Sequence, residues 1–199
     1  MTRTLLSAST SLLLVFMISP VQAQGQQAGP PLLAKQLVRP KATTRLLVTS
    51  PAFASGGELS DRYTQNGEGV SPPIAWTRGP QGTQSYVLLA EDAGVNRPEP
   101  VFHWVVYDIP STMTTVSGNQ PADATLNNGA MQGLNVRKAH GFLGPKPPAG
   151  QTHPYHFEVF ALDTKLRLDP ANSDRNAVVA AMKDHVLADG DIVANYTGK

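Results

Sequence analysis

The chain has 199 residues, with 16 basic residues, 15 acidic residues and no cysteine. The lack of cysteine excludes a disulfide framework, a thiolate nucleophile and a cysteine-ligated zinc site. A formal net charge of +1 does not supply the basic surface needed for sequence-independent nucleic-acid binding, so no nucleic-acid partner is expected.

The first 23 residues have the pattern of an export signal. Arg3 gives a positive start, Leu12–Ile18 is a short apolar core, and Ala23 ends a small-residue cleavage pattern. The apolar run is short for a permanent anchor, and no later segment is long and apolar enough to cross a bilayer. We expect residues 1–23 to be a signal peptide and the protein to be periplasmic or secreted. A retained N-terminal anchor is the alternative.

Residues 24–44 are expected to form a flexible linker. The segment is rich in glycine, proline and glutamine and shows no sustained periodicity. The folded part is expected to begin near Arg45. The remaining residues 45–199 are enough for one domain that buries about two-thirds of its surface, and too few to favour two domains.

Strand patterns dominate the expected domain. Runs of β-branched, aromatic and other apolar residues are separated by glycine and proline, of which the chain has 17 each. The expected strands are Arg45–Thr49, Ser85–Ala90, Phe102–Tyr107, His153–Leu162 and Asp191–Tyr196.

One helix is expected near the end of the chain. Ser173 can cap its start and Gly190 suits its exit. The apolar residues at helical spacing between them are Val178, Val179, Met182, Val186 and Leu187. Strands and long helices do not alternate, which disfavours a doubly wound parallel sheet. The sequence predicts a mainly β fold, an antiparallel β-sandwich of Greek-key type with one or two peripheral helices.

Two histidines stand out by their positions in the expected strands. Because strand side chains alternate, His103 is expected to share a face with Val105 and Tyr107, and His153 with Tyr155. His103 lies between two large aromatic residues, so its ring must face solvent or find a polar partner. A histidine followed two residues later by a tyrosine offers two donors on one side of a sheet, which suits phosphate oxygens.

An acidic residue and a loop could complete such a site. Asp92 follows the strand Ser85–Ala90, where its carboxylate could accept an imidazole N–H and leave the other ring nitrogen for a ligand. The segment Gly141–Gly150 has too much glycine and proline for a helix or a central strand. Its backbone could approach an anion closely, or it could be a rigid surface loop.

Several segments resemble those of a known family. In chain order they are Ser71–Trp76, Ala90–Asp92, Phe102–Pro110, Gly144–Gly150, His153–Phe157, Val159–Asp163 and His185–Tyr196. Together they resemble the phosphatidylethanolamine-binding protein family, in its bacterial branch of Raf-kinase-inhibitor-like proteins, over about residues 45–199. The resemblance implies an antiparallel β-sandwich with a small pocket at one end for phosphate or phospho-headgroup oxygens.

The resemblance also implies which residues bind the ligand. Carried over position by position, they are Asp92, His103, Gly144, Pro148, His153 and Tyr155. The sequence departs from the family in one place. The family usually has Asp-Pro-Asp where this chain has Asp92, Ala93 and Gly94, so the proline and the second carboxylate are missing.

These observations favour binding over catalysis. The expected function is that of an exported protein that binds a small anion, phosphate or a phospholipid headgroup, with no cofactor, no metal and no catalytic residue. The first alternative is an inhibitor or interaction partner of another exported protein. The second is a hydrolase or metal enzyme, because Asp92 and His103 resemble two parts of a nucleophilic triad and, with His153, a two-histidine-one-carboxylate metal set. No Gly-x-Ser-x-Gly motif supports the hydrolase. The sequence does not indicate an oligomeric state.

Overall fold

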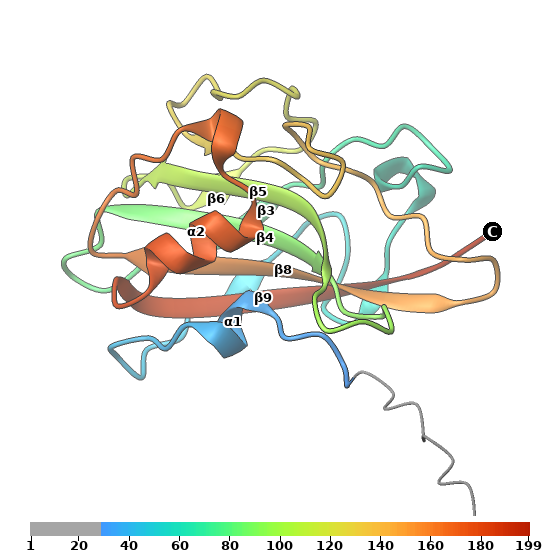
Figure 1. The fold of residues 1–199 in the computed structure, drawn as a ribbon, viewed down its shortest axis with the longest axis horizontal. Coiled ribbons are helices and arrows are strands. Elements are labelled where there is room, and N and C mark those ends of the chain that lie inside the picture. Colours follow the sequence, from blue (N-terminus) through green and yellow to red (C-terminus); the bar gives the residue numbers. More distant parts are fainter. Residues whose placement is uncertain (1–28) are drawn as a thin grey trace, which may run out of the picture.

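The computed structural model describes residues 29–199, so the segment predicted as a signal peptide lies outside the described residues. Two sheets form the described part of the molecule (Figure 1). The large sheet has the strand order β2–β9–β8–β4–β5–β7, and the small sheet has the order β1–β3–β6. The strands are β1 (Val48–Thr49), β2 (Gly57–Glu58), β3 (Ile74–Trp76), β4 (Ser85–Asp92), β5 (Val101–Pro110), β6 (Thr115–Val116), β7 (Met131–Gln132), β8 (Thr152–Leu162) and β9 (Val186–Thr197).

The prediction of a mainly β fold with few helices is confirmed. Each of the five predicted strands overlaps a strand of the structure, although β1 is shorter than predicted and the others are longer. The pairings between named strands are antiparallel except that of β2 with β9, which is parallel. The Greek-key connection stays a prediction.

The large sheet is covered on both faces, which explains the unbroken apolar runs of its central strands. Every residue of β4 is buried. Tyr86 and Leu88 point into the core between the two sheets. Val87 and Leu89 point into a second core, under the helix α2 (Arg175–Met182). Figure 1 shows α2 lying across this second face of the large sheet.

The predicted helix ends earlier than expected. Asp174, not Ser173, caps α2, because its carboxylate accepts the N–H groups of the next turn. Lys183 leaves the helical conformation with ψ of 132°, and Asp184 follows in a left-handed conformation with φ of 65°, so the helical path ends before the apolar pattern stops. Val186, Leu187 and Gly190 therefore lie in β9, and helical spacing was the wrong interpretation for these residues.

The segment predicted as a linker differs in its described part. Residues Ala34–Leu37 form the short helix α1, beside β9 in Figure 1. Leu33, Ala34 and Val38 are buried, and the last two belong to the core under α2. The Ala34 N–H donates to the buried carboxylate of Glu91, at 2.9 Å. Burial of apolar side chains and this hydrogen bond therefore pack the segment on the sheet, and both depend on residues that are distant in the sequence.

Neither α1 nor α2, the two α-helices within residues 29–199, has the length and hydropathy needed to span a bilayer. Two short 3₁₀ turns complete the described elements, at Asp61–Tyr63 and Pro170–Asn172.

Candidate functional site

A β-bulge places His103. The pairing of β4 with β5 passes from Ala90–Trp104 to Glu91–Phe102, which leaves His103 as an extra residue. Its ring meets the ring of Tyr155 edge-on, with centroids 5.3 Å apart, and Tyr155 belongs to the core between the sheets. The predicted face shared with Val105 and Tyr107 is therefore wrong, because those two side chains enter the other core. Simple alternation fails wherever a bulge adds a residue.

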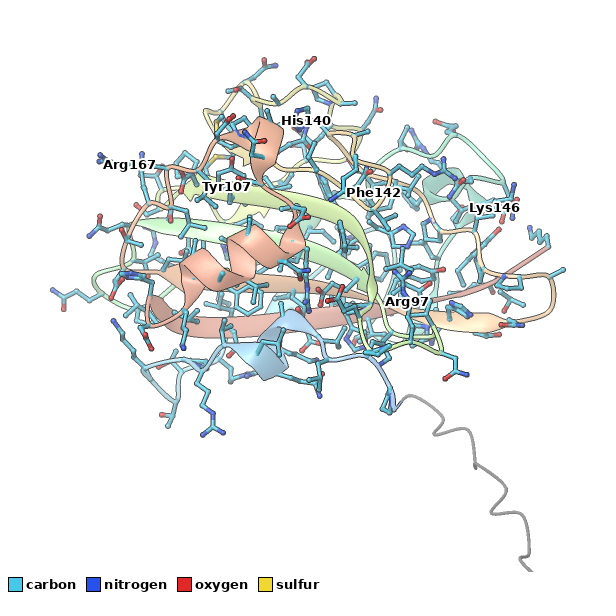
Figure 2. The ribbon with its side chains drawn as sticks, viewed as in Figure 1. Arg97, Tyr107, His140, Phe142, Lys146 and Arg167 are labelled. Carbon is cyan, nitrogen blue, oxygen red and sulfur yellow. The ribbon has the colours of Figure 1, made fainter. Side chains whose placement is uncertain are left out.

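A cavity of about 250 Å³ opens at the end of the large sheet where β4 ends and β5 and β8 begin. Lys146 on its rim lies at the same end of the molecule as Arg97 from the loop between β4 and β5, as Figure 2 shows. The cavity is lined by Gln65, Asp92, Val95, Val101, His103, Val136, Arg137, Leu143, Lys146, Pro147, Pro148, His153 and Tyr155.

Five of the six predicted site residues lie together in this lining: Asp92, His103, Pro148, His153 and Tyr155. Gly144 does not line the cavity. A Cβ added to Gly144 would lie 2.8 Å from the backbone of Thr64, and its carbonyl accepts the Gln65 side-chain amide at 2.7 Å. Gly144 therefore serves close packing between two loops beside the cavity, and its predicted role in ligand binding stays a prediction.

Asp92 and His153 form a buried pair inside the cavity. The His153 Nδ1 lies 2.9 and 3.0 Å from the two Asp92 carboxylate oxygens. The Gly94 N–H also donates to Asp92, at 2.8 Å. Since the carboxylate can only accept from Nδ1, it fixes the orientation of the imidazole. The other nitrogen, Nε2, has one weak neighbour, the Gln151 side-chain oxygen at 3.4 Å.

The His103 ring is held by the main chain of the loop that crosses it. Its Nδ1 lies 2.6 Å from the Leu143 carbonyl oxygen. The Leu143 N–H in turn donates to the His103 carbonyl at 2.8 Å. Burial lowers the pKa of His103, more than the Leu143 carbonyl and the Asp92 charge raise it. Its Nε2 is buried and has no hydrogen-bond partner among the described residues.

Tyr155 contributes a second buried polar atom without a hydrogen-bond partner among the described residues. Its hydroxyl is buried and lacks a hydrogen-bond partner within residues 29–199. Burial and the nearby Asp92 charge raise the pKa of Tyr155, so the hydroxyl stays protonated and can donate. A buried polar group without a partner costs about 1–3 kcal/mol, so a ligand that satisfies it gains that much.

Sequence reasoning did not single out two cations in the lining, Arg137 and Lys146. The Arg137 guanidinium donates to the Gln65 side chain at 2.8 Å. The Lys146 ammonium makes no hydrogen bond or ion pair with the described residues. Lys146 lies within the resembling segment Gly144–Gly150, which was a usable signal, whereas Arg137 lies in a loop that carries no motif.

The arrangement does not form the metal set considered from the sequence. Within residues 29–199, no group of three or more His, Asp or Glu side chains is placed to hold a metal ion. The Asp92 oxygens are taken by His153, and the His103 Nδ1 is taken by a carbonyl. No serine or threonine lines the described cavity either.

Comparisons with known proteins agree with this architecture. Residues 49–197 match the family model for the phosphatidylethanolamine-binding protein. A relative named UPF0098 protein, from Methanothermobacter thermautotrophicus, is 38% identical over 146 residues, which cover 73% of this chain and 94% of the relative.

Two solved structures are similar to the described fold. Escherichia coli YbcL, described as a new member of the mammalian PEBP family, has a TM-score of 0.73 and 29% identity. That match covers 78% of this chain and all of YbcL. The PEBP homolog CT736 of Chlamydia trachomatis has a TM-score of 0.69 and 28% identity, over 78% of this chain and 99% of CT736.

Proposed function

Because the chain belongs to the phosphatidylethanolamine-binding protein family, we propose that it binds a small anion, phosphate or a phosphate-bearing headgroup, in the cavity beside β4 and β8. The observation that carries this proposal is the pair of buried, unpartnered polar atoms in one lining, His103 Nε2 and the Tyr155 hydroxyl. Their lost hydrogen bonds favour a polar occupant over an apolar one.

The charges of the lining favour an anion. Arg137 and Lys146 bring two positive charges, and Arg137 can offer a bidentate pair of donors to a phosphate. The one carboxylate, Asp92, already accepts from His153 and from the Gly94 N–H. An entering anion therefore meets two cations and a carboxylate whose oxygens are engaged by donors.

The size of the cavity restricts the ligand. About 250 Å³ is below the roughly 300–1,000 Å³ typical of sites that enclose drug-sized molecules. A phosphate or a compact headgroup fits this scale. Any acyl chains of a phospholipid would remain outside the cavity.

Ligand-dependent stabilisation tests the proposal. Inorganic phosphate and phosphoethanolamine should each raise the melting temperature of the purified protein, and the rise should increase with ligand concentration. At a ligand concentration of 100 times Kd, the free energy of unfolding should increase by about 2.7 kcal/mol. His153→Ala should abolish the rise, and His103→Ala should reduce it. His156→Ala is the matched control, because His156 lies on the same strand but pairs with Asp191 outside the cavity. If neither anion stabilises the wild-type protein, the proposal fails and a protein partner becomes the better hypothesis.

We also propose that the protein is exported and that the signal is removed after Ala23, on the sequence pattern alone. Expression of the full chain in a bacterial host, followed by fractionation and intact-mass measurement, should give a periplasmic or secreted product that begins at Gln24. A full-length product in the cytosolic fraction would refute export.

A further inference from the structure

The buried wall of the cavity contains a hydrogen-bond acceptor, in the His103 ring, whose protonation follows from geometry. A carbonyl oxygen can only accept, so the His103 Nδ1, 2.6 Å from the Leu143 oxygen, carries the ring proton. The reciprocal bond from the Leu143 N–H to the His103 carbonyl keeps this loop in place. In a neutral ring, Nε2 is then an unprotonated nitrogen with a free lone pair, and it has no protein partner among the described residues.

The surroundings of His103 favour that neutral ring. Burial is the largest influence and lowers its pKa. The Leu143 carbonyl and the Asp92 charge raise the pKa by less, whereas Arg137 and His153 lower it further. A cationic His103 would therefore add a third positive charge to a wall that already faces two cations, without an unpaired carboxylate beside it.

Three other polar groups in the lining can donate. The Tyr155 hydroxyl is protonated, and Arg137 and Lys146 have no acceptor capacity at all. A ligand that satisfies the whole site must therefore offer several acceptor oxygens to these donors. It must also offer one proton to the His103 Nε2.

We propose that the site, if it binds anions as proposed above, selects oxyanions that carry an O–H group and discriminates against those that carry none. The preferred class is hydrogenphosphate and phosphomonoesters in their monoanionic form. Sulfate and phosphodiesters have oxygens of similar geometry but no proton to donate. Placing one of their lone pairs against the His103 Nε2 lone pair should weaken binding about tenfold or more, because a polar group in the site is left unpaired.

The inference separates two sources of phosphate. A phospholipid headgroup is linked through a phosphodiester, which has no P–O–H group. Free phosphate keeps one near neutral pH, and soluble monoesters keep one in their monoanionic form, below a second pKa of about 6. The site is therefore expected to prefer the soluble compounds over the diester of an intact lipid.

Calorimetric titration of the full chain with three probes tests the selection, at about pH 7.5, where most phosphate is the dianion that still carries one proton. The probes are inorganic phosphate, sulfate and dimethyl phosphate. Sulfate matches the charge of the phosphate dianion, and dimethyl phosphate is a singly charged diester. Phosphate should bind about tenfold more tightly than either of the others.

Two variants distinguish the acceptor from a donor. His103→Ala should bring phosphate and sulfate within about twofold of each other, because only the acceptor is lost. Tyr155→Phe should weaken both anions by a similar factor and keep the preference for phosphate. Nitrogen-15 spectra of histidine-labelled wild-type protein give a readout that needs no variant, and the phosphate complex should show His103 neutral with the proton on Nδ1.

Other results have distinct meanings. Equal affinities for phosphate and sulfate, with both His103 nitrogens protonated in the complexes, would overturn the inference and leave the anion site intact. Failure of all three probes to bind would overturn the proposed function itself, and with it the selection.

Discussion

Gly94 and the His153 ring occupy neighbouring positions so close that a side chain at 94 has no room. A Cβ built on Gly94 would lie 2.4 Å from His153 Cγ and 2.8 Å from its Cβ. The Gly94 backbone is not in the left-handed region, so this contact, not backbone strain, explains the glycine. The residue where the resembling family usually has its second Asp is therefore the one that lets this imidazole lie against Asp92.

The close contact between Gly94 and His153 predicts that substitutions at the two positions have non-additive effects on the free energy of unfolding. Gly94→Ala should push the ring away, break its hydrogen bonds to Asp92, and lower both melting temperature and phosphate affinity, at a cost of about 1–3 kcal/mol in stability. In a His153→Ala background the same change should cost less, because the ring is gone and only the contact with the Cβ of residue 153, at 2.8 Å, remains. A double-mutant cycle on the free energy of unfolding measures the difference. Additive effects of the two changes would show that the contact is not what requires glycine.

The cations of the rim should control anion affinity through long-range attraction. Lys146→Met is expected to weaken phosphate binding about fivefold at low salt and less at high salt, because screening reduces the loss. Arg78→Met is the control, since Arg78 lies in a different surface hollow, beside Gly79 and Pro80. Titrations at low and high salt give the comparison. A loss for Lys146→Met that does not change with salt would contradict an electrostatic role.

Glu158 should make stability depend on pH. Its side chain is fully buried, and burial together with the charge of Glu91 raises its pKa well above the ordinary value of 4.5. Lys35 lowers that pKa and Asp191 raises it, both by less. The folded protein thus keeps a proton that the unfolded chain releases. Stability is fully present below the unfolded pKa and falls as the pH rises towards the folded pKa, by up to about 1.4 kcal/mol per pH unit.

Replacement by a neutral isostere isolates this effect. Glu158→Gln should flatten the decline in melting temperature between about pH 5 and about pH 8, and should be more stable than wild type at the upper end. Glu68→Gln changes an exposed carboxylate and serves as the control. Parallel curves for wild type and Glu158→Gln would mean that Glu158 is already ionised in the folded protein.

Loss of one partner of the buried ion pair between Arg175 and Glu91 should be strongly destabilising. The Nε–oxygen distance of this pair is 2.5 Å, and both side chains are buried. Arg175 also donates to the Leu32 carbonyl at 2.7 Å, next to α1. Arg175→Met leaves the Glu91 carboxylate without its cation and should cost about 3–5 kcal/mol in urea unfolding.

An exposed pair offers the comparison for Arg175. Lys138 and Asp174 are 2.9 Å apart at the surface, so Lys138→Met should cost less than about 1 kcal/mol. Hydrogen exchange of the α1 amides should also rise in Arg175→Met and stay unchanged in Lys138→Met. A similar loss in the free energy of unfolding for the two variants would show that burial does not determine how much the loss of Arg175 destabilises the protein.

Local patterns predicted the sheet well and its irregularities poorly. The buried strands β4 and β8 follow from their apolar runs, since few other structures suit such segments. The bulge at His103 leaves no mark in the sequence, because it is fixed by the pairing of β5 with β4. α2 ends where Lys183 and Asp184 leave the helical conformation, and the packing of α1 depends on Glu91 and Arg175, which are far away in the chain.

Some residues of the candidate site could also be predicted from local sequence patterns, and others could not. Asp92, His153 and Tyr155 were predictable because they lie on paired strands whose alternation is regular at that point. Arg137 could not be found, since the loop that carries it reaches the cavity only through tertiary packing. Gly144 was assigned to the ligand from the resemblance, and a loop glycine suits both close ligand approach and close loop packing. The close packing against the Thr64 backbone becomes visible only in the folded chain.

The cavity draws its inner wall from strands and much of its outer rim from loops, and this division has a consequence for how the protein could change. Asp92, His103, His153 and Tyr155 are embedded in the sheet, where a substitution disturbs the pairing or packing of neighbours. Arg137, Lys146 and Val95 sit on connections that the sheet does not need for its pairing. Ligand preference could therefore diverge among descendants, or be redesigned in the laboratory, through the rim alone while the scaffold keeps its stability.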